Sequence, residues 1–172
     1  GQLPETETLT SSGAFANFCF GQGELLATPI QIAAMMNTIA AGGIWREPLF
    51  LECTLDETTG ESLTALAHRG ARRVFSAQTA RALRELLASV VTEGTGHEAA
   101  PTEGTAAGKT GTAQTGQFAA GKELKNYWFA GFYPARNPRY TIVVLQDGQT
   151  GPSQTSAAIF AQVCDALDAA GE

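Results

Sequence analysis

Apolar residues recur at helical spacing in three parts of the chain, around residues 29–41, 77–92 and 153–171. This pattern predicts three amphipathic helices. The side chains expected to face a core are Ile32, Met36, Ile39 and Ala40, then Ala80, Leu83, Leu87, Val90 and Val91, and finally Ala157, Phe160, Val163 and Leu167. Arg81, Arg84 and Glu85 are expected on the outer face of the second helix.

Local start and stop signals support these helices. Thr28 can cap the first helix and Gln31 can complete a capping box, while Gly42-Gly43 ends it. Ser76 and Ser153 are the expected caps of the other two helices.

In two further runs, residues 127–133 and 140–146, the side chains on both alternating faces are apolar. This pattern predicts strands that are covered on both sides. Their short, proline-containing connection predicts an antiparallel hairpin. A weaker hairpin is expected where residues 49–55 and 62–66 flank a turn at residues 56–60.

The remaining segments are expected to be irregular, namely residues 1–27 and the polar stretch 115–126. Within the first of them, Gly21-Gln22-Gly23 is interpreted as a turn that leads into a helix, with an anion-binding nest as the weaker alternative. The predicted fold class is therefore α/β of the α+β type, with an antiparallel sheet flanked by helices in one domain of residues 1–172.

Composition excludes several functions. The chain has 172 residues and a net charge of -6, and its largest basic cluster, Arg69, Arg72 and Arg73, is expected to be a solvated face, so nucleic acid is not an expected partner. Cys19, Cys53 and Cys164 lack metal-ligand spacing; they are interpreted as small apolar fillers that form one disulfide at most. No metal or cofactor is expected.

Membrane and targeting signals are also missing from the sequence. No stretch approaches the roughly 20 apolar residues needed to span a bilayer, and no signal peptide is visible. Because Gly1 stands where a native start would have Met, we expect a processed chain or an excised piece.

The strongest candidate for chemistry is Lys109 in the run of small residues from Gly104 to Gln114. Small residues let another molecule lie against the backbone, and a lysine there offers a charge to an anion or a proton to a reaction. A solvated lysine in a flexible loop is the simpler alternative. A phosphate-binding loop is excluded, because three residues instead of four separate Gly104 from Gly108, and Glu103 replaces the required glycine.

Lys109-Thr110-Gly111 is also one of three motifs found together in serine acyl-transfer enzymes, with Ser-x-x-Lys and Ser-Asp-Asn. It precedes the two buried strands, as an edge strand of their sheet would. Strict alternation puts Lys109 and Thr112 on opposite faces, so both can serve one ligand only along the open edge of the strand. His97 is a conceivable proton-transfer group without a local partner, and His68 is expected to be exposed.

The chain resembles the transpeptidase domain of penicillin-binding proteins, in particular the monofunctional class B type. The matching stretches, in the family's order, are residues 21–33, 37–43, 90–96, 108–114 and 128–134. The resemblance implies a partial penicillin-binding protein or serine β-lactamase-like fold and a serine D,D-transpeptidase of peptidoglycan synthesis.

The resemblance also implies residue roles. Lys109 would join the proton-relay and electrostatic network around the nucleophile. Thr110 and Thr112, with Gly111 between them, would bind the carboxylate of a D-alanyl-D-alanine stem peptide or of a β-lactam. The backbone N–H of Thr112 would be an oxyanion donor, and Gln114 would border the ligand. The Gly-Gln-Gly stretch matches a structural element of the family without assigned chemistry.

The chain departs from the family in one respect. Its lysines are Lys109, Lys122 and Lys125, and no serine lies three residues before any of them; Ser-x-Asn is also missing. We therefore expect the C-terminal half of a transpeptidase domain that is inactive alone, because the nucleophile is not in this chain. A non-catalytic binding or assembly module and a β-lactamase relative are the alternatives.

The resemblance implies a parent protein anchored in the cytoplasmic membrane, with this domain outside it. In the complete fold another strand would pair beside residues 140–146, so self-association through that exposed edge or an uncovered face of the sheet is expected.

Overall fold

A three-stranded antiparallel sheet forms the centre of the computed structural model, which describes residues 1–51, 53–65 and 70–171. The strands are β5 (Ala107–Ala119), β6 (Lys122–Tyr133) and β7 (Tyr140–Gln149), in the order β5-β6-β7. The predicted β6–β7 hairpin is confirmed. The predicted loop at residues 115–126 is wrong, because β5 and β6 continue through it to a turn at Ala120 and Gly121, both with positive φ.

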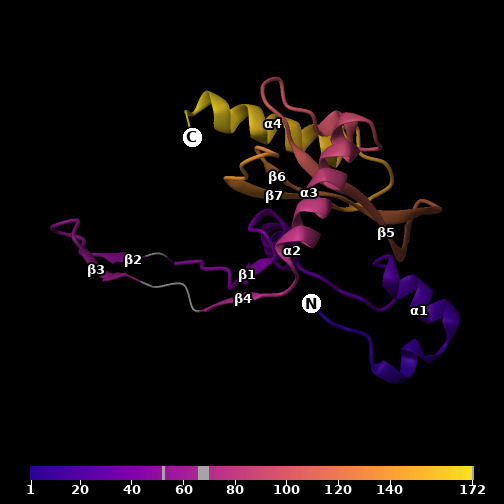
Figure 1. Cartoon of the computed structure of the whole chain (residues 1–172). Helices are drawn as coiled ribbons and strands as arrows, with labels where there is room; N and C mark the ends of the chain where they lie inside the picture. Colours follow the sequence, from indigo (N-terminus) through magenta and orange to yellow (C-terminus); the bar gives the residue numbers. More distant parts are fainter. Residues whose placement is uncertain (52, 66–69, 172) are drawn as a thin grey trace.

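The helices lie on both faces of the sheet (Figure 1). On one face, α2 (Pro29–Ala40) and α3 (Ala77–Thr92) pack against Ala130 and Phe132 of β6. On the other face, α4 (Ser156–Ala169) packs against Phe129 and Tyr133. Because neighbouring residues of β6 point to opposite clusters, this strand is covered on both sides, as its sequence predicts.

The observed helix starts agree with the sequence signals in two cases of three. Thr28 and Gln31 form the expected capping box of α2. Ser76 caps α3 by accepting a 3.0 Å hydrogen bond from the N–H of Thr79. The predicted start of α4 at Ser153 is wrong, since Thr155 is the cap and accepts from the N–H of Ala158 at 3.1 Å.

Two expectations about helix faces are corrected. Val163 is 37% exposed, whereas Cys164 is fully buried in the core between α4 and β6. The buried stripe takes the four-residue step from Phe160 to Cys164 instead of the three-residue step to Val163. Arg84 does not lie free on an outer face, because its long side chain donates hydrogen bonds to the carbonyls of Ala135 and Arg136 after β6.

The expectation of an irregular N-terminal segment is partly wrong. A 3₁₀ helix, η1 (Thr6–Thr10), is followed by α1 (Ser12–Cys19), which Ser11 caps. None of the residues of α1 is buried, which explains why its sequence has no apolar stripe that would predict a helix. Cys19 is likewise exposed and Cys53 is half-buried, so only Cys164 fills a core as predicted; all three thiols are free.

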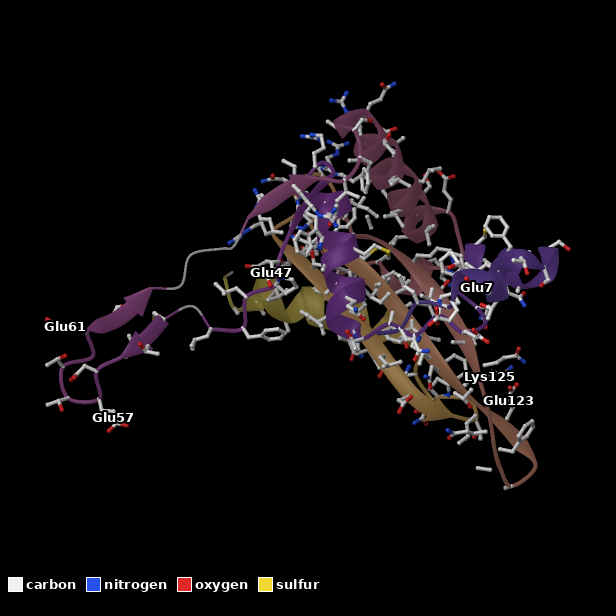
Figure 2. The ribbon with its side chains drawn as sticks, turned by 90° about the horizontal axis from the view of Figure 1, so that it is seen from below. Glu7, Glu47, Glu57, Glu61, Glu123 and Lys125 are labelled. Atoms are coloured by element: carbon white, nitrogen blue, oxygen red, sulfur yellow. The ribbon has the colours of Figure 1, made fainter. Side chains whose placement is uncertain are left out.

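A hairpin of β2 (Cys53–Leu55) and β3 (Ser62–Ala65) extends away from the sheet (Figure 1). Its predicted turn is confirmed: one carboxylate oxygen of Asp56 accepts from the N–H groups of Thr59 and Thr58, and these bonds hold the pKa of Asp56 below its usual value. The first strand is shorter than the predicted run 49–55. Figure 2 shows Glu57 and Glu61 at this end of the hairpin.

A second pairing, of β1 (Ile44–Arg46) with β4 (Ala71–Arg73), connects the hairpin to the body and was not predicted. Arg72 and Arg73 are exposed, as expected, but each has a partner: Arg72 lies 5.4 Å over the ring of Trp45, and Arg73 donates to the carbonyl of Gly42 at 2.9 Å. His68, Arg69 and the end of the run 62–66 lie outside the described residues. Among the described residues, no helix has the length and apolar character that crossing a membrane requires.

Two weakly acidic groups near α4 are held protonated by the fold. The hydroxyl of Tyr133 donates to the Asp168 carboxylate, and this bond, with burial, raises the pKa of Tyr133 from 10.0 to about 12. Burial, followed by the nearby charges of Asp165 and Asp168, raises the pKa of Cys164 from 9.0 to about 12. In both cases the neutral form is the one that the folded state accommodates.

We therefore expect stability to fall as the pH rises from 9 towards 12. In this range the unfolded chain releases the Cys164 and Tyr133 protons while the folded chain retains them, so the free energy of unfolding decreases with pH; below pH 9 this contribution is fully present. Urea unfolding at a series of pH values measures the slope. Cys164→Ala should flatten it, and Cys19→Ala, at an exposed site, should leave it unchanged. An equal slope in Cys164→Ala and the parent chain would contradict the assignment.

Candidate functional site on the open edge of β5

Lys109 lies on the edge strand of the sheet, as its motif predicts. β5 pairs with β6 along one side, and within the described residues no strand pairs along its other side. Lys109 is opposite Ala130 and shares the face of α2 and α3, whereas Thr110 is opposite Phe129 and shares the face of α4. Lys109 and Thr112 therefore start from opposite faces of the strand.

The lysine nevertheless reaches the open edge. Its Nζ donates to the carbonyl oxygen of Thr110 at 3.1 Å and lies 3.0 Å from the Thr110 hydroxyl oxygen. That hydroxyl is in turn 3.3 Å from the hydroxyl of Thr95, which follows α3. A cation and two hydroxyls thus gather beside the edge, although the sequence pattern gave no role to Thr95.

The same edge carries outward-facing backbone groups. The carbonyl of Thr110 accepts a hydrogen bond from Lys109, and the carbonyl of Thr112 accepts one from Nε2 of Gln22 at 3.1 Å. Both carbonyls therefore point away from β6, towards the open edge. In a strand, the N–H and C=O of one residue point to the same side, and those of the next residue to the other. The N–H groups of Thr110 and Thr112 are therefore also directed to the open edge.

Gln22 is the second residue that sequence reasoning missed. The predicted turn is present, with Gly21 and Gly23 at φ +80° and +83°. The N–H of Gln22 donates to the carbonyl of Asn17 at 2.9 Å, which fixes the turn to the end of α1. The signal available in the sequence was the Gly-Gln-Gly stretch itself, but nothing local shows that its side chain reaches a strand 90 residues away.

Packing explains the glycine that precedes the lysine. A Cβ at Gly108 would lie 2.5 Å from Cε1 of Phe129 and 2.7 Å from the carbonyl oxygen of Ala130. Only glycine therefore lets β5 lie this close to β6. At Gly111 an added Cβ would meet the Cβ of Trp128 at 3.5 Å, an ordinary contact, so packing does not require that glycine.

The remaining candidates lie apart from this group. The side-chain amide of Gln114 donates to the carboxylate of Glu123 on β6 at 3.0 Å, so it is turned across the sheet. His97 is exposed in the short 3₁₀ helix η2 (His97–Ala99). Within residues 1–51, 53–65 and 70–171, no three His, Cys, Asp or Glu side chains cluster as metal ligands would.

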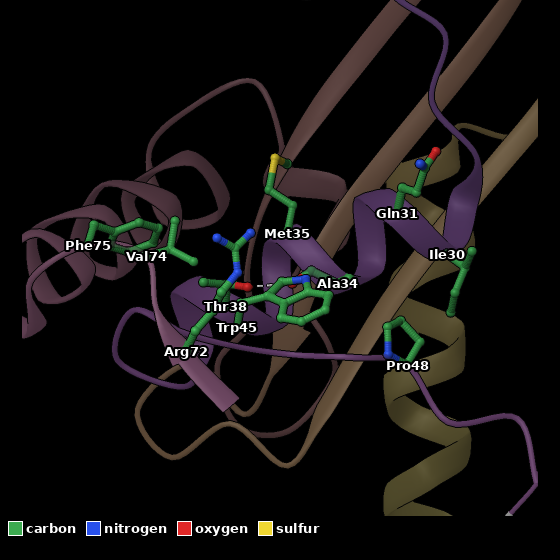
Figure 3. Close-up of a pocket in the computed structure, with 10 residues that line it drawn as sticks. All are labelled: Ile30, Gln31, Ala34, Met35, Thr38, Trp45, Pro48, Arg72, Val74 and Phe75. Atoms are coloured by element: carbon green, nitrogen blue, oxygen red, sulfur yellow. Dashed lines mark hydrogen bonds between the residues drawn. The ribbon is translucent and has the colours of Figure 1, made fainter. Parts of the chain in front are cut away.

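A hollow of about 410 Å³ lies elsewhere, between α2 and the β1–β4 pair (Figure 3). Its wall is mainly apolar and includes Ile30, Met35, Trp45 and Phe75. None of the β5 residues lines it. A ligand of Lys109 therefore has to lie along the open strand edge, which can pair with an extended, anionic molecule, and not in this hollow.

The sequence and the fold are both similar to those of known proteins. A family model described as the penicillin binding protein transpeptidase domain matches residues 1–165. The penicillin-binding protein PbpB of Mycolicibacterium smegmatis is 35% identical over 182 residues, which cover 97% of this chain and 28% of PbpB. The peptidoglycan D,D-transpeptidase FtsI of Escherichia coli K12 is 33% identical over 155 residues, which cover 86% of this chain and 24% of FtsI.

Among solved structures, penicillin-binding protein 3 of Mycobacterium tuberculosis, in complex with aztreonam, superposes with a TM-score of 0.81 at 31% identity. The match covers 98% of this chain and 40% of that one. The chain thus spans about a quarter of the two curated relatives, which are class B proteins, as the resemblance implied. On the family match, the sequence identities and the shared fold, the chain belongs to the penicillin-binding protein transpeptidase family.

Proposed function

We propose that this chain is part of a peptidoglycan D,D-transpeptidase that acts on D-alanyl-D-alanine peptides in cell-wall synthesis. The observation that carries the proposal is the position of the Lys109 ammonium at the open edge of β5, 3.0 Å from the Thr110 hydroxyl. A peptide ligand can pair with this edge through its backbone, because edge strands bind extended chains by β-augmentation.

The terminal carboxylate of the ligand meets the hydroxyls of Thr110 and Thr112, with Lys109 supplying positive charge. Charge-assisted hydrogen bonds of this kind are stronger than neutral ones. The Thr112 N–H serves as one oxyanion donor for the carbonyl that is attacked. β-Lactams carry a comparable anionic group and carbonyl and bind in the same place. Gln114 borders the ligand only if its contact with Glu123 breaks.

The attacking group is a serine hydroxyl from outside these 172 residues, since the chain contains no Ser-x-x-Lys. Serine Oγ attacks the penultimate D-alanine carbonyl, the peptide C–N bond breaks, and D-alanine leaves with the proton that the serine lost. Lys109 belongs to the network that moves this proton. An acceptor amine on a second stem peptide then attacks the ester and frees the serine.

Labelling with a fluorescent penicillin tests the proposal. The chain alone should show no covalent label after denaturing electrophoresis. The parent protein, in which this chain is joined to the serine-bearing segment, should be labelled, and heat-denatured parent should not. Covalent labelling of the chain alone would show that the nucleophile had been mislocated, and an unlabelled native parent would contradict transpeptidase activity.

A non-catalytic binding or assembly module is the second candidate, and it differs from the enzyme in having no Ser-x-x-Lys motif anywhere in the parent protein. A parent gene without that motif upstream would decide for this candidate. For the enzyme, we place the domain outside the cytoplasmic membrane, on a parent protein with an N-terminal membrane anchor, where its peptidoglycan substrate lies.

We further expect the isolated chain to self-associate. β7 pairs only with β6 in the described part of the sheet, so its outer edge offers unpaired backbone groups to a second copy. Sedimentation velocity over a concentration series should show dimers or larger species that increase with concentration. A chain that stays monomeric at the highest concentration would contradict this expectation.

A further inference from the structure

The contact between Gln22 and Thr112 joins two distant parts of the chain at the proposed ligand edge. The Gln22 side-chain amide donates to the Thr112 carbonyl at 3.1 Å, and this carbonyl faces away from β6. An extended peptide that pairs with the edge needs the same carbonyl as the acceptor for one of its own N–H groups. The acceptor that a ligand requires is therefore already in use.

The turn that carries Gln22 is held in a defined conformation. Gly21 and Gly23 on either side have positive φ, a conformation in which other residues are strained. Two backbone hydrogen bonds, from Gly21 to Phe18 at 3.1 Å and from Gln22 to Asn17 at 2.9 Å, tie the turn to α1. The half-buried Gln22 side chain is thus presented to the strand from a fixed base.

We propose that Gln22 occupies the place of the ligand's amide donor on the β5 edge, and that a peptide ligand binds by replacing it. This inference rests on the proposed function, because it takes a D-alanyl-D-alanine peptide as the ligand. The exchange replaces one neutral hydrogen bond by another, so Gln22 lowers the affinity of every ligand that pairs with this carbonyl. It also covers part of an edge that would otherwise be free to pair with other chains.

Gln22→Met tests the proposal, because methionine keeps the length of the side chain and removes the N–H donor. The matched control is Gln117→Met, at an exposed position near the far end of β5. The probe is diacetyl-L-lysyl-D-alanyl-D-alanine, titrated into each ¹⁵N-labelled chain and followed by NMR. Loss of one competing hydrogen bond should tighten binding about 2- to 10-fold in Gln22→Met. The control should bind like the parent chain.

A second measurement needs no substitution. In the ligand-free chain, the side-chain amide protons of Gln22 should exchange with solvent more slowly than those of Gln117, and this difference should disappear when the peptide saturates the site. Equal exchange rates in the free chain would overturn the proposal, as would equal or weaker peptide binding by Gln22→Met. If no chain binds the peptide at all, the inference fails, whereas the proposed function is decided separately by penicillin labelling of the parent protein.

Discussion

Replacing Lys109 with methionine is expected to slow acylation of the complete domain by a fluorescent penicillin about 10²–10³-fold, the usual cost of removing one electrostatic contribution to an acyl-transfer transition state. Methionine preserves length but removes the cation that lies 3.0 Å from the Thr110 hydroxyl. The measurement is the second-order labelling rate of the parent protein that contains this chain. Because Lys109 is exposed, the fold should not be affected.

Lys122→Met is the control for this experiment. Lys122 is also an exposed lysine, but it begins β6 beside the turn at Ala120 and Gly121, at the far end of the hairpin from Lys109. It should retain the parental rate. Equal labelling rates for the parent protein, Lys109→Met and Lys122→Met would show that Lys109 is not part of the proton-relay network and would contradict the proposed mechanism.

Replacing Phe160 with alanine is expected to lower the free energy of unfolding by about 3–5 kcal/mol. Phe160 is fully buried, and its ring centroid lies 4.7 Å from that of Phe129, so it joins α4 to the central strand. Such a loss is a large part of the roughly 5–15 kcal/mol that stabilises a typical domain. Urea unfolding followed by circular dichroism measures it.

Phe118→Ala is the matched control, because Phe118 is 69% exposed on the distal part of β5. It should cost little, since its ring has little contact to lose. Similar losses for both variants would mean that α4 does not depend on Phe160 for its packing. A large loss for Phe160→Ala alone would show that α4 stabilises the strand that carries Phe129 and pairs with Lys109 and Thr110.

Most of the fold could be predicted from local sequence. The capping box of α2 and the apolar periodicity of α3 each depend on a short segment of sequence, so both helices could be predicted without knowing the tertiary contacts. Residues 115–126 were missed because their polar side chains stand on a hairpin that extends into solvent, where pairing does not require an apolar face. The start of α4 was misplaced because several hydroxyl residues precede the helix, and the sequence alone does not select Thr155 over Ser153.

The site was predictable where a short motif determines it and unpredictable where distant segments meet. The motif predicts that the Lys109–Thr112 stretch lies on an edge strand, and the topology confirms that placement. Thr95 and Gln22 contact this strand only because the turns that follow α3 and α1 pack against β5 in the folded chain. The sequence also gave no sign that Gln114 pairs with Glu123, which requires the correct hairpin register.

The close approach at Gly108 limits which mutations this edge can accept. The obstacle there is steric, since any side chain would meet the ring of Phe129 and the Ala130 carbonyl within 2.7 Å. On the proposed function, selection by β-lactams therefore cannot remodel this edge by mutating Gly108 without forcing the paired strands apart. Adaptive changes must instead appear at outward-pointing neighbours, where new side chains have room.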